Sequence, residues 1–476
     1  MARLLVLLPI ILWLTMPGRE RTLDAWVTVL VLGGFVLIAA AYASLVRLTL
    51  RRRDGAWGAS GTARRGMATA RAISVVWFAF ALYQLDFPAA VQRLALPGTT
   101  LPTLIGTAPV YVCWFALHWS RFAVELAQWQ TTLNERLSNG APVHAPPGRW
   151  RYVMSRTRVE VLFALVPVAG VLALRDVASA GLARAGIDTA LPAIEAAISF
   201  GGIALIFIAA PAILRHVLPT SSMPAGPLRQ RLEDVANRTG MRFRDILVWH
   251  TDNAVANAAV MGLFPQVRYV LLSDLLIETM TDQQVEAVFA HEVGHVRHRH
   301  MIWYVVFVAI MMLALAGPGT DLERWVRAQW VGNADAVALA IVGATLGLFL
   351  TMLGLLSRQF EQQADVFASR NVTTDDDAPP VRGALVFATA LRRVAQINGM
   401  PMTNPPLRPT PTGTLEWVLG HASSHFHGTV ARRMNAVQEI AADDHRARRF
   451  DTRMRFVRVL LLLLLAVGSA WVWMNA

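Results

Sequence analysis

Long apolar segments recur along the chain and alternate with shorter stretches in which polar and basic residues gather. Several approach the roughly 20 residues that an α-helix needs to cross the hydrocarbon core of a bilayer. The pattern predicts a mostly α-helical, polytopic membrane protein with about nine transmembrane helices. The predicted spans are 4–16, 25–46, 72–90, 101–118, 160–174, 192–213, 301–316, 336–356 and 459–475.

The first apolar segment, 4–16, is short enough to be a signal sequence. The residues that follow it do not form the small-residue pattern of a cleavage site. We therefore predict that this segment is retained as a membrane anchor.

Two stretches between the spans have the patterns of a folded α+β domain. In 220–300, Pro227 begins a helical pattern that ends at Gly240, and a strand is predicted at 241–248. Apolar segments at 257–261 and 267–272, separated by a turn with Gly and Pro, predict a hairpin. The second stretch, 357–458, continues the span that ends near 356 and contains a predicted helix at about 381–398.

A His-Glu-Val-Gly-His string begins at His291 in a segment of helical period. Thr281 and Gln284 form the capping-box pattern that begins such a helix. On a helix, His291 and His295 lie one turn apart on one face, so both imidazoles can reach one metal ion. Glu292 then points toward the water molecule that the metal activates. This spacing predicts a zinc-dependent hydrolase.

A catalytic zinc site usually has three protein ligands, so the two histidines need a partner. His298 and His300 do not have the spacing of the metzincin pattern. We interpret the cluster 297–300 as a basic interfacial belt before a span. Glu323 lies in the loop across the membrane, from which a ligand cannot reach the histidines.

Glu361 is the remaining candidate for the third ligand. The spans 301–316 and 336–356 form a hairpin that returns the chain to the side on which the histidines lie. Glu361 and Asp365 are one helical turn apart on a common face. Asp365 is thus placed to accept a hydrogen bond from a ligand histidine.

These motifs resemble those of the integral-membrane gluzincins, the zinc metallopeptidases that include the CaaX prenyl protease and HtpX-type proteases. The resemblance covers roughly 225–440 and implies one Zn²⁺ per chain. It rests on Asn257-Ala258 followed by Gly262, the helix from His291 to His295, the element from Ser357-Arg358 through Glu361 to Asp365, and a late His427 with Arg433.

The resemblance offers His427 or Arg433 as a donor to the oxyanion that develops during hydrolysis. The family usually has two prolines after the late histidine, whereas this chain has Gly428 and Thr429, so His425 is an alternative to His427. A second interpretation makes Arg433 a structural ion-pair residue and His427 a surface histidine.

In such peptidases the substrate commonly adds as an extended strand beside an exposed sheet edge. The segment from Asn257 through Ala258 and Ala259 to Met261 is the candidate edge. The alternative is an ordinary buried hairpin strand, although the polar Asn257 in an apolar stretch favours a contact with substrate.

Composition supports the membrane class: 55% of the residues are hydrophobic and 16% are charged, and the mean hydropathy is +0.43. The net charge of +12 arises from basic residues in the loops, which predicts a lipid bilayer and no nucleic acid as partner. Arginines concentrated around 51–65 and 136–156 place those loops in the cytoplasm. The zinc helix then faces the cytoplasm from a bacterial inner membrane. The single Cys113 excludes an intrachain disulfide.

The predicted function is a membrane-embedded zinc metalloendopeptidase that acts on membrane-associated or misfolded proteins or peptides. Alternatives are CaaX-type processing of lipidated C-termini and, in a different class, a transport or scaffold protein with a structural metal. The sequence predicts no oligomeric state. The predicted regions are an N-terminal transmembrane region at 1–219 with about six spans, the two halves of the peptidase domain at 220–300 and 357–458, a transmembrane hairpin at 301–356, and a C-terminal transmembrane helix at 459–476.

Overall fold

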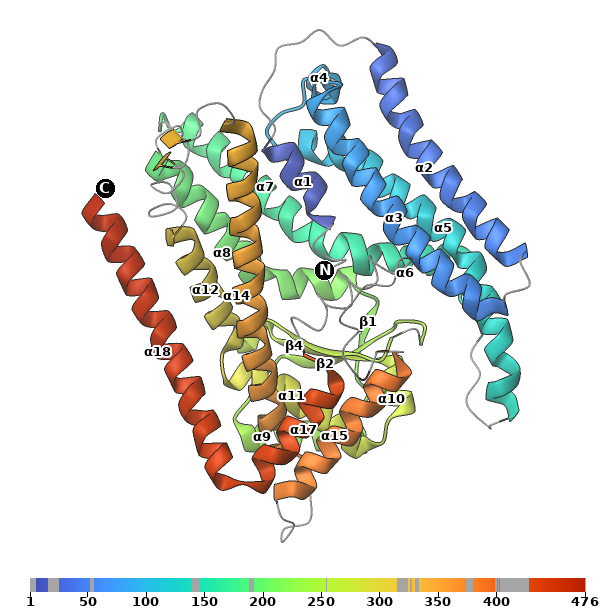
Figure 1. Ribbon diagram of the computed structural model, residues 1–476, viewed down its shortest axis with the longest axis vertical. Coiled ribbons are helices and arrows are strands. Elements are labelled where there is room, and N and C mark those ends of the chain that lie inside the picture. Colours follow the sequence, from blue (N-terminus) through green and yellow to red (C-terminus); the bar gives the residue numbers. More distant parts are fainter. Residues whose placement is uncertain are drawn as a thin grey trace. The chain divides into compact units, whose positions relative to one another are not determined.

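The structure, a computed structural model, is mostly helical and divides into two compact units, Met1–Thr220 and Ser221–Ala476 (Figure 1). The residues that it describes are 6–15, 25–51, 55–138, 145–187, 192–253, 255–314, 324–325, 328–329, 334–373, 380–398, 400, 402 and 428–475.

The first unit is built from helices. They are α1 (Leu8–Leu14), α2 (Ala25–Arg51), α3 (Gly55–Tyr83), α4 (Phe87–Gln92), α5 (Thr100–Ser138), α6 (Arg149–Thr157), α7 (Phe163–Arg184) and α8 (Pro192–Val217). Helices α2, α3 and α5 pack side by side around a core that includes Phe78 and Trp114. A π-helical turn, Arg158–Leu162, joins α6 to α7.

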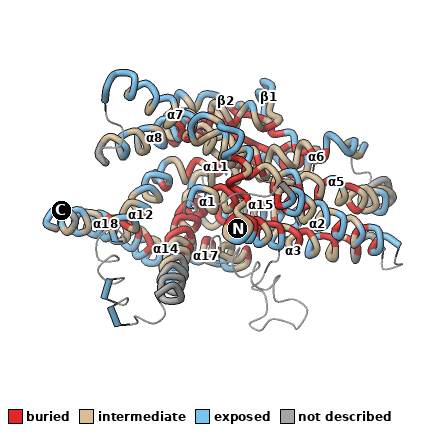
Figure 2. Tube along the Cα trace, turned by 90° about the horizontal axis from the view of Figure 1, so that it is seen from above, coloured by how far each residue is buried: buried red, intermediate tan, exposed pale blue. Residues whose placement is uncertain are grey.

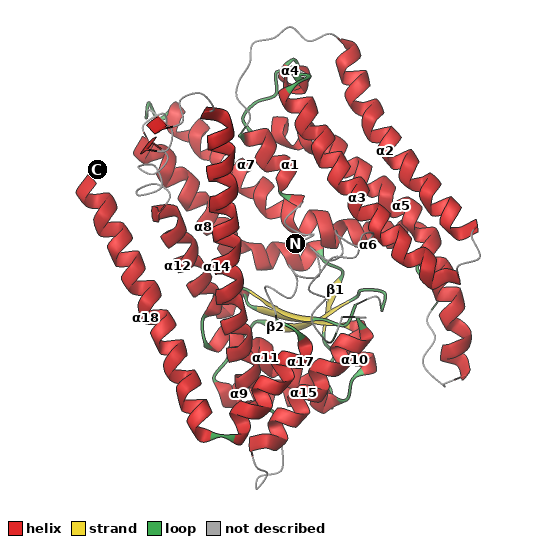
Figure 3. Cartoon of the chain, viewed as in Figure 1, coloured by secondary structure: helices red, strands yellow, loops and turns green. Residues whose placement is uncertain are grey.

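The second unit combines helices with a small sheet (Figure 3). The strands are β1 (Thr220–Ser222), β2 (Asp245–Trp249), β3 (Ala258–Met261) and β4 (Tyr269–Ser273). The helices are α9 (Pro227–Thr239), α10 (Asp274–Thr279), α11 (Asp282–Arg297), α12 (His300–Ala314), α14 (Ala334–Asn371), α15 (Pro380–Ile397), α17 (Val430–Ala442) and α18 (Asp444–Asn475).

The four strands lie in the order β1-β2-β4-β3. Strand β2 pairs with β4 in parallel, and β3 pairs with β4 antiparallel, so β3 forms one edge of the sheet. The core of the unit lies between this sheet and α9, α11 and α15. Phe289, Ala290 and Val293 of α11 are fully buried, and the trace near the α11 label in Figure 2 is coloured largely as buried. The helix that carries the histidines is therefore held by packing on several sides.

Local sequence signals explain how these elements begin and end. Pro227 begins α9, and Gly240, with φ 70°, ends it. Both halves of the capping box between Thr281 and Gln284 form at the start of α11. The predicted hairpin turns at Gly262, where φ is 108° and a Cβ atom would lie 2.4 Å from the carbonyl oxygen of Val267. These predictions are confirmed.

In the described part of the chain, six helical segments are long and apolar enough to cross a membrane. A seventh would be the bent pair of α11 and α12, which meet at 46°. The six segments are Trp26–Arg51, Ala59–Tyr83, Thr100–Thr131, Arg149–Arg184, Ala197–Val217 and Asp444–Trp471. The total of nine spans stays a prediction.

Some predicted boundaries differ from the structure. Of the span predicted at 72–90, only the part up to Tyr83 belongs to α3, which begins at Gly55. The helix is interrupted after Tyr83, because Asp86 adopts a left-handed conformation, with φ 54°, and a new short helix begins at Phe87 with Pro88 in its first turn. An apolar run alone could not reveal this break, because the backbone changes direction inside it.

A largely buried polar cluster joins three helical segments of the first unit. Glu160, in the π-helical turn, forms an ion pair with Arg71 of α3. His118 of α5 lies 3.3 Å from the Glu160 carboxylate and 2.8 Å from the Arg71 guanidinium. Arg71 also lies over the ring of Trp114 at 5.0 Å. Since unpaired charges are costly in such surroundings, we expect the cluster to fix how these helices pack.

We expect Glu160→Gln to destabilise the first unit by about 3 kcal/mol, because it leaves the buried Arg71 without its counter-charge. Thermal unfolding of the detergent-purified protein would measure the loss. The control is Glu195→Gln, which breaks an exposed pair with Arg175, at 2.6 Å, and should change the stability by less than about 1 kcal/mol. Equal melting temperatures for Glu160→Gln and the unmodified protein would contradict the prediction.

Candidate metal centre

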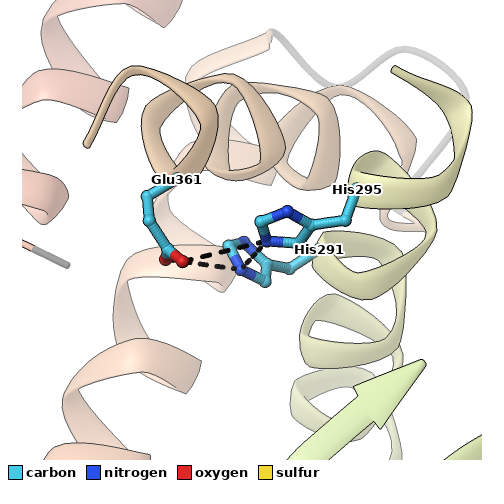
Figure 4. Close-up of side chains that lie close together, drawn as sticks. All are labelled: His291, His295 and Glu361. Carbon is cyan, nitrogen blue, oxygen red and sulfur yellow. Dashed lines mark hydrogen bonds and ion pairs between the residues drawn. The ribbon is translucent and has the colours of Figure 1, made fainter. Parts of the chain in front are cut away.

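Two helices of the second unit bring together three side chains that can hold a metal ion. Helix α11 supplies His291 and His295, and α14 supplies Glu361, whose carboxylate points at the two imidazoles (Figure 4). One ligand atom from each residue lies within 4.8 Å of the others. The Nε2 atoms of the two histidines are 3.1 Å apart, and the Glu361 oxygens lie 3.8 and 4.0 Å from them.

The donor chemistry of this cluster fits zinc. His291 Nδ1 lies 2.9 Å from the Asp365 carboxylate, which leaves Nε2 directed toward His295 and Glu361. A neutral imidazole whose Nδ1 proton is held by a carboxylate presents a bare Nε2 to a metal. Two such nitrogens and one carboxylate are the ligand set of a common class of catalytic zinc sites.

Arg433 of α17 forms ion pairs with two carboxylates of the cluster, those of Asp365 and Glu361. Its Nε and Nη2 atoms lie 2.8 and 2.6 Å from the two oxygens of Asp365, and Nη1 lies 3.1 Å from Glu361. Burial alone would raise the pKa of Asp365, but Arg433 and His291 hold it below its usual value. Of the two interpretations of Arg433 from the sequence, these contacts favour the ion-pair residue.

The two ligand helices approach each other closely at Gly294. A Cβ atom on this glycine would lie 3.0 Å from the Cα atom of Ala364 and 3.2 Å from the Cβ atom of Phe367, both on α14. The absence of a side chain therefore sets the separation between the histidines and Glu361.

We expect Gly294→Ala to push α11 from α14, costing about 1–3 kcal/mol of stability and weakening metal binding about tenfold. Thermal unfolding of the zinc-free protein and competition with a chelator measure the two effects. The matched control is Gly347→Ala on α14, where the added methyl group has no atom within 4 Å. Unchanged metal affinity in Gly294→Ala would show that the spacing does not limit the site.

Glu292 lies beside the ligands and also contacts the sheet. Its carboxylate accepts a hydrogen bond from the backbone N–H of Val260, in strand β3. Burial raises the pKa of Glu292 to about 7, although His291 opposes the shift. A carboxyl group with a pKa near neutrality can both accept and return a proton under ordinary conditions.

A cavity of about 960 Å³ opens onto the metal ligands. Its wall includes the polar side chains of Glu292 and Arg433 and apolar side chains such as Phe387 and Leu391 of α15. A mostly apolar cavity with a few convergent polar groups is the usual form of a ligand or substrate site.

Strand β3 forms part of the cavity wall. Ser273 N–H donates to the carbonyl oxygen of Asn257 at 2.9 Å, and Ala259 and Met261 face residues of β4 in register. Since successive backbone groups of a strand point in opposite directions, the Val260 N–H faces outward, as its bond to Glu292 requires. Asn257 and Ala258 also line the cavity. The outer edge of β3 thus runs beside the candidate metal site.

Asn398 at the end of α15 supports the start of this edge. Its side-chain oxygen accepts from the Ala256 N–H at 3.0 Å, and its side-chain nitrogen donates to the Ala256 carbonyl at 2.7 Å. No sequence pattern points to this residue, which lies 142 positions from Ala256.

Most of the predicted site residues meet at this place. His291, Glu292, His295 and Glu361 gather at the cavity, with Asp365 and Arg433 beside them. Asn257 and Ala258 lie in the cavity wall, and Ala259 follows them in β3. The predicted His425 and His427 lie outside the described residues, as does Glu323.

One prediction was wrong. His300 was interpreted as part of a basic interfacial belt, but it is 1% exposed and its Nδ1 atom lies 2.8 Å from Nδ1 of His295. Arg299 adopts a left-handed conformation, with φ 57°, between α11 and α12. The resulting bend turns His300 back toward the ligand histidine, which a continuous helix could not do.

Comparison with known proteins supports the resemblance seen in the sequence. Residues 222–441 match the model of peptidase family M48. Over 175 residues the chain is 29% identical to the CAAX prenyl protease 1 homolog of Oryza sativa, covering 34% of this chain and 40% of the relative. Over 174 residues it is 30% identical to the protease HtpX homolog of Bacteroides fragilis, covering 34% and 51%.

These alignments span about half or less of the curated relatives. The structure is also similar to that of Ste24p from S. mikatae, with 16% sequence identity and a TM-score of 0.48, over 88% of this chain and 100% of that one. The predicted resemblance to the membrane metallopeptidases, placed in the segment around the histidines, is confirmed.

Proposed function

We propose that this chain, whose residues 222–441 match peptidase family M48, is a membrane-embedded zinc metalloendopeptidase. The observation that carries the proposal is the cluster of His291, His295 and Glu361 beside Glu292, at the wall of a cavity. A metal held only for structure would normally have four protein ligands and no need of an adjacent carboxylate such as Glu292.

His291, His295 and Glu361 would hold the zinc ion. When bound, zinc supplies Lewis-acid activation of a water molecule and of the peptide carbonyl. Glu292 accepts the proton of the attacking water and returns it to the amine that leaves. Arg433 and Asp365 hold Glu361 and His291 in place, so that these ligands need not reorganise during the reaction.

The substrate would bind as an extended segment along the outer edge of β3. The outward-facing backbone groups on this edge, at Ala258 and Val260, lie in the cavity wall, where the Val260 N–H donates to Glu292. Hydrogen bonds to backbone groups do not depend on side-chain identity, so this mode suits an enzyme that cleaves many sequences. Asn257, Ala258 and Ala259 would be the substrate-binding positions.

We further propose the topology that the arginine distribution predicts. The chain would span a bacterial inner membrane about nine times, with the peptidase domain facing the cytoplasm. The two halves of that domain, 220–300 and 357–458, would be joined by the transmembrane hairpin 301–356, with spans before and after them at 1–219 and 459–476. Membrane-associated or misfolded proteins would then be the accessible substrates.

A second candidate function is processing of lipidated C-termini, which is favoured by the similarity to a relative named CAAX prenyl protease 1 homolog. The apolar side chains of the cavity wall, such as Phe387 and Leu391, would contact the lipid chain. The similarity to a relative named protease HtpX homolog fits the first candidate, general proteolysis.

The test offers two substrates to the detergent-purified protein: an unfolded, unprenylated protein and a prenylated peptide. We expect cleavage that a chelator abolishes and added Zn²⁺ restores, because the three ligands hold an exchangeable catalytic ion. The preferred substrate distinguishes general proteolysis from processing. Bound zinc without cleavage of either substrate would favour a structural metal and contradict the proposal.

A further inference from the structure

A chain of buried polar side chains runs from the second ligand histidine to the C-terminal helix. His295 Nδ1 lies 2.8 Å from His300 Nδ1, and His300 Nε2 lies 3.0 Å from the side-chain oxygen of Gln363. That same oxygen accepts a hydrogen bond from Arg458 Nη2 at 2.9 Å. The four residues come from α11, α12, α14 and α18.

The contacts have one consistent arrangement of protons. The Nε2 atom of His295 faces His291 and Glu361, so it must be bare to bind a metal. A neutral His295 then carries its proton on Nδ1 and donates it to His300. His300 must accept at Nδ1, carry its own proton on Nε2, and donate to Gln363.

Arg458 determines which atom donates in each hydrogen bond of this series. A guanidinium only donates, so the atom of Gln363 that faces it must be the oxygen. With that oxygen fixed, His300 can only donate to Gln363. If the amide of Gln363 turned over, its NH₂ group would donate to His300, and two N–H groups would face each other between His300 and His295.

Packing holds the rings in this geometry. His300 is 1% exposed, and its ring stacks on Phe360 with centroids 4.3 Å apart and planes 5° from parallel. Gln363 is 6% exposed. Water therefore has little access to replace a lost partner in the chain.

The position of Arg458 also needs an explanation. It directly precedes the predicted span 459–475, at the end of the arginine-rich half of α18, where an arginine needs polar partners to stay out of the hydrocarbon. It donates to Gln363, lies 3.5 Å from the carbonyl oxygen of His298, and faces the ring of Trp303 at 5.8 Å. All of these contacts come from elements next to the metal ligands.

We propose that His300 is a positioning residue for His295, and that Gln363 and Arg458 fix the tautomer that makes His295 a metal ligand. In most zinc sites a carboxylate or a backbone carbonyl has this role, whereas here a second histidine does. The inference rests on the proposed function, because it requires that the cluster binds zinc.

The experiment measures the zinc dissociation constant of the full-length, detergent-purified protein by competition with a chelator. His300→Phe keeps the stacked ring but removes the acceptor, and we expect zinc to bind about 10–100-fold more weakly. His300→Asn places its amide oxygen where Nδ1 lies, and should bind zinc within about threefold of the unmodified protein. If His300 only packed against Phe360, His300→Asn would lower zinc affinity more than His300→Phe, because Asn loses the stacked ring.

Matched variants on α14 and α18 test the hydrogen bonds beyond His300. Gln363→Met and Arg458→Met should weaken zinc binding, whereas Arg453→Met should leave it unchanged. Arg453 lies on the same helix as Arg458 but donates to Gln362. If His300→Phe does not fold, as judged by thermal unfolding without zinc, Gln363→Met decides the question.

Each outcome has a separate meaning. A wild-type protein that binds no zinc overturns the proposed function. Wild-type zinc affinity in His300→Phe, or in Gln363→Met where that variant decides, overturns the inference alone. An equal loss in His300→Asn and His300→Phe also overturns it. In the His295→Ala background, His300→Phe should have no further effect on zinc affinity, because its contact to the ligand is already gone.

Discussion

Replacing Glu292 with glutamine is expected to lower kcat by about 10³-fold or more while zinc stays bound, because the amide cannot accept a proton from water. Glu292 is not one of the three groups that can hold the metal. Burial raises the pKa of Glu292 to about 7, and a cation bound nearby would lower it again, so the carboxylate that acts as base is available at neutral pH.

The comparison needs both a rate and a metal content. Cleavage of an unfolded protein gives the rate, and elemental analysis of the purified variant gives zinc per chain. Asp282→Asn is the matched control, since Asp282 is a carboxylate in the first turn of the same helix and should leave the rate unchanged. A Glu292→Gln variant with normal zinc content and normal cleavage would remove Glu292 from the mechanism.

Short-range patterns carried most of what the sequence could predict. The capping box at Thr281, the turn at Gly262 and the end of α9 at Gly240 each depend on a few neighbouring residues. Glu361 was predicted over a longer distance, because the expected hairpin of two spans would return the chain to the side of the histidines. The structure places Glu361 beside His291.

What could not be predicted depends on contacts between distant residues. His300 acquires its role from Gln363, 63 positions away, and from a left-handed residue at Arg299 that bends the chain. Similarly, Glu160 and Arg71 are 89 positions apart. A histidine next to arginines before an apolar run has the composition of a membrane interface, and only tertiary packing distinguishes a buried partner from a surface residue.

The acids around the candidate metal site fall into two groups. Glu292 lies in the motif itself, and its role follows from helical spacing. Asp365 and Glu361 share one face of α14, but their common partner Arg433 comes from α17, 68 positions after Asp365. The sequence left the function of Arg433 open because its geometry depends on how three helices pack.

Replacing Glu361 with glutamine is expected to release zinc and abolish activity. The change removes a charged ligand, so zinc affinity should fall by more than the roughly 100-fold that loss of an outer hydrogen-bond partner can cost. It also removes one of the two carboxylates that form ion pairs with Arg433.

Zinc content and cleavage of the Glu361→Gln variant would be measured as for Glu292→Gln. The two variants should then differ: Glu361→Gln loses the zinc ion, whereas Glu292→Gln keeps the ion and loses the proton acceptor. Gln362→Ala, one position along α14 at a residue that contacts Arg453, is the control and should retain zinc. If Glu361→Gln kept its zinc, the third ligand would have to be sought elsewhere in the chain, because two imidazoles do not complete a catalytic site.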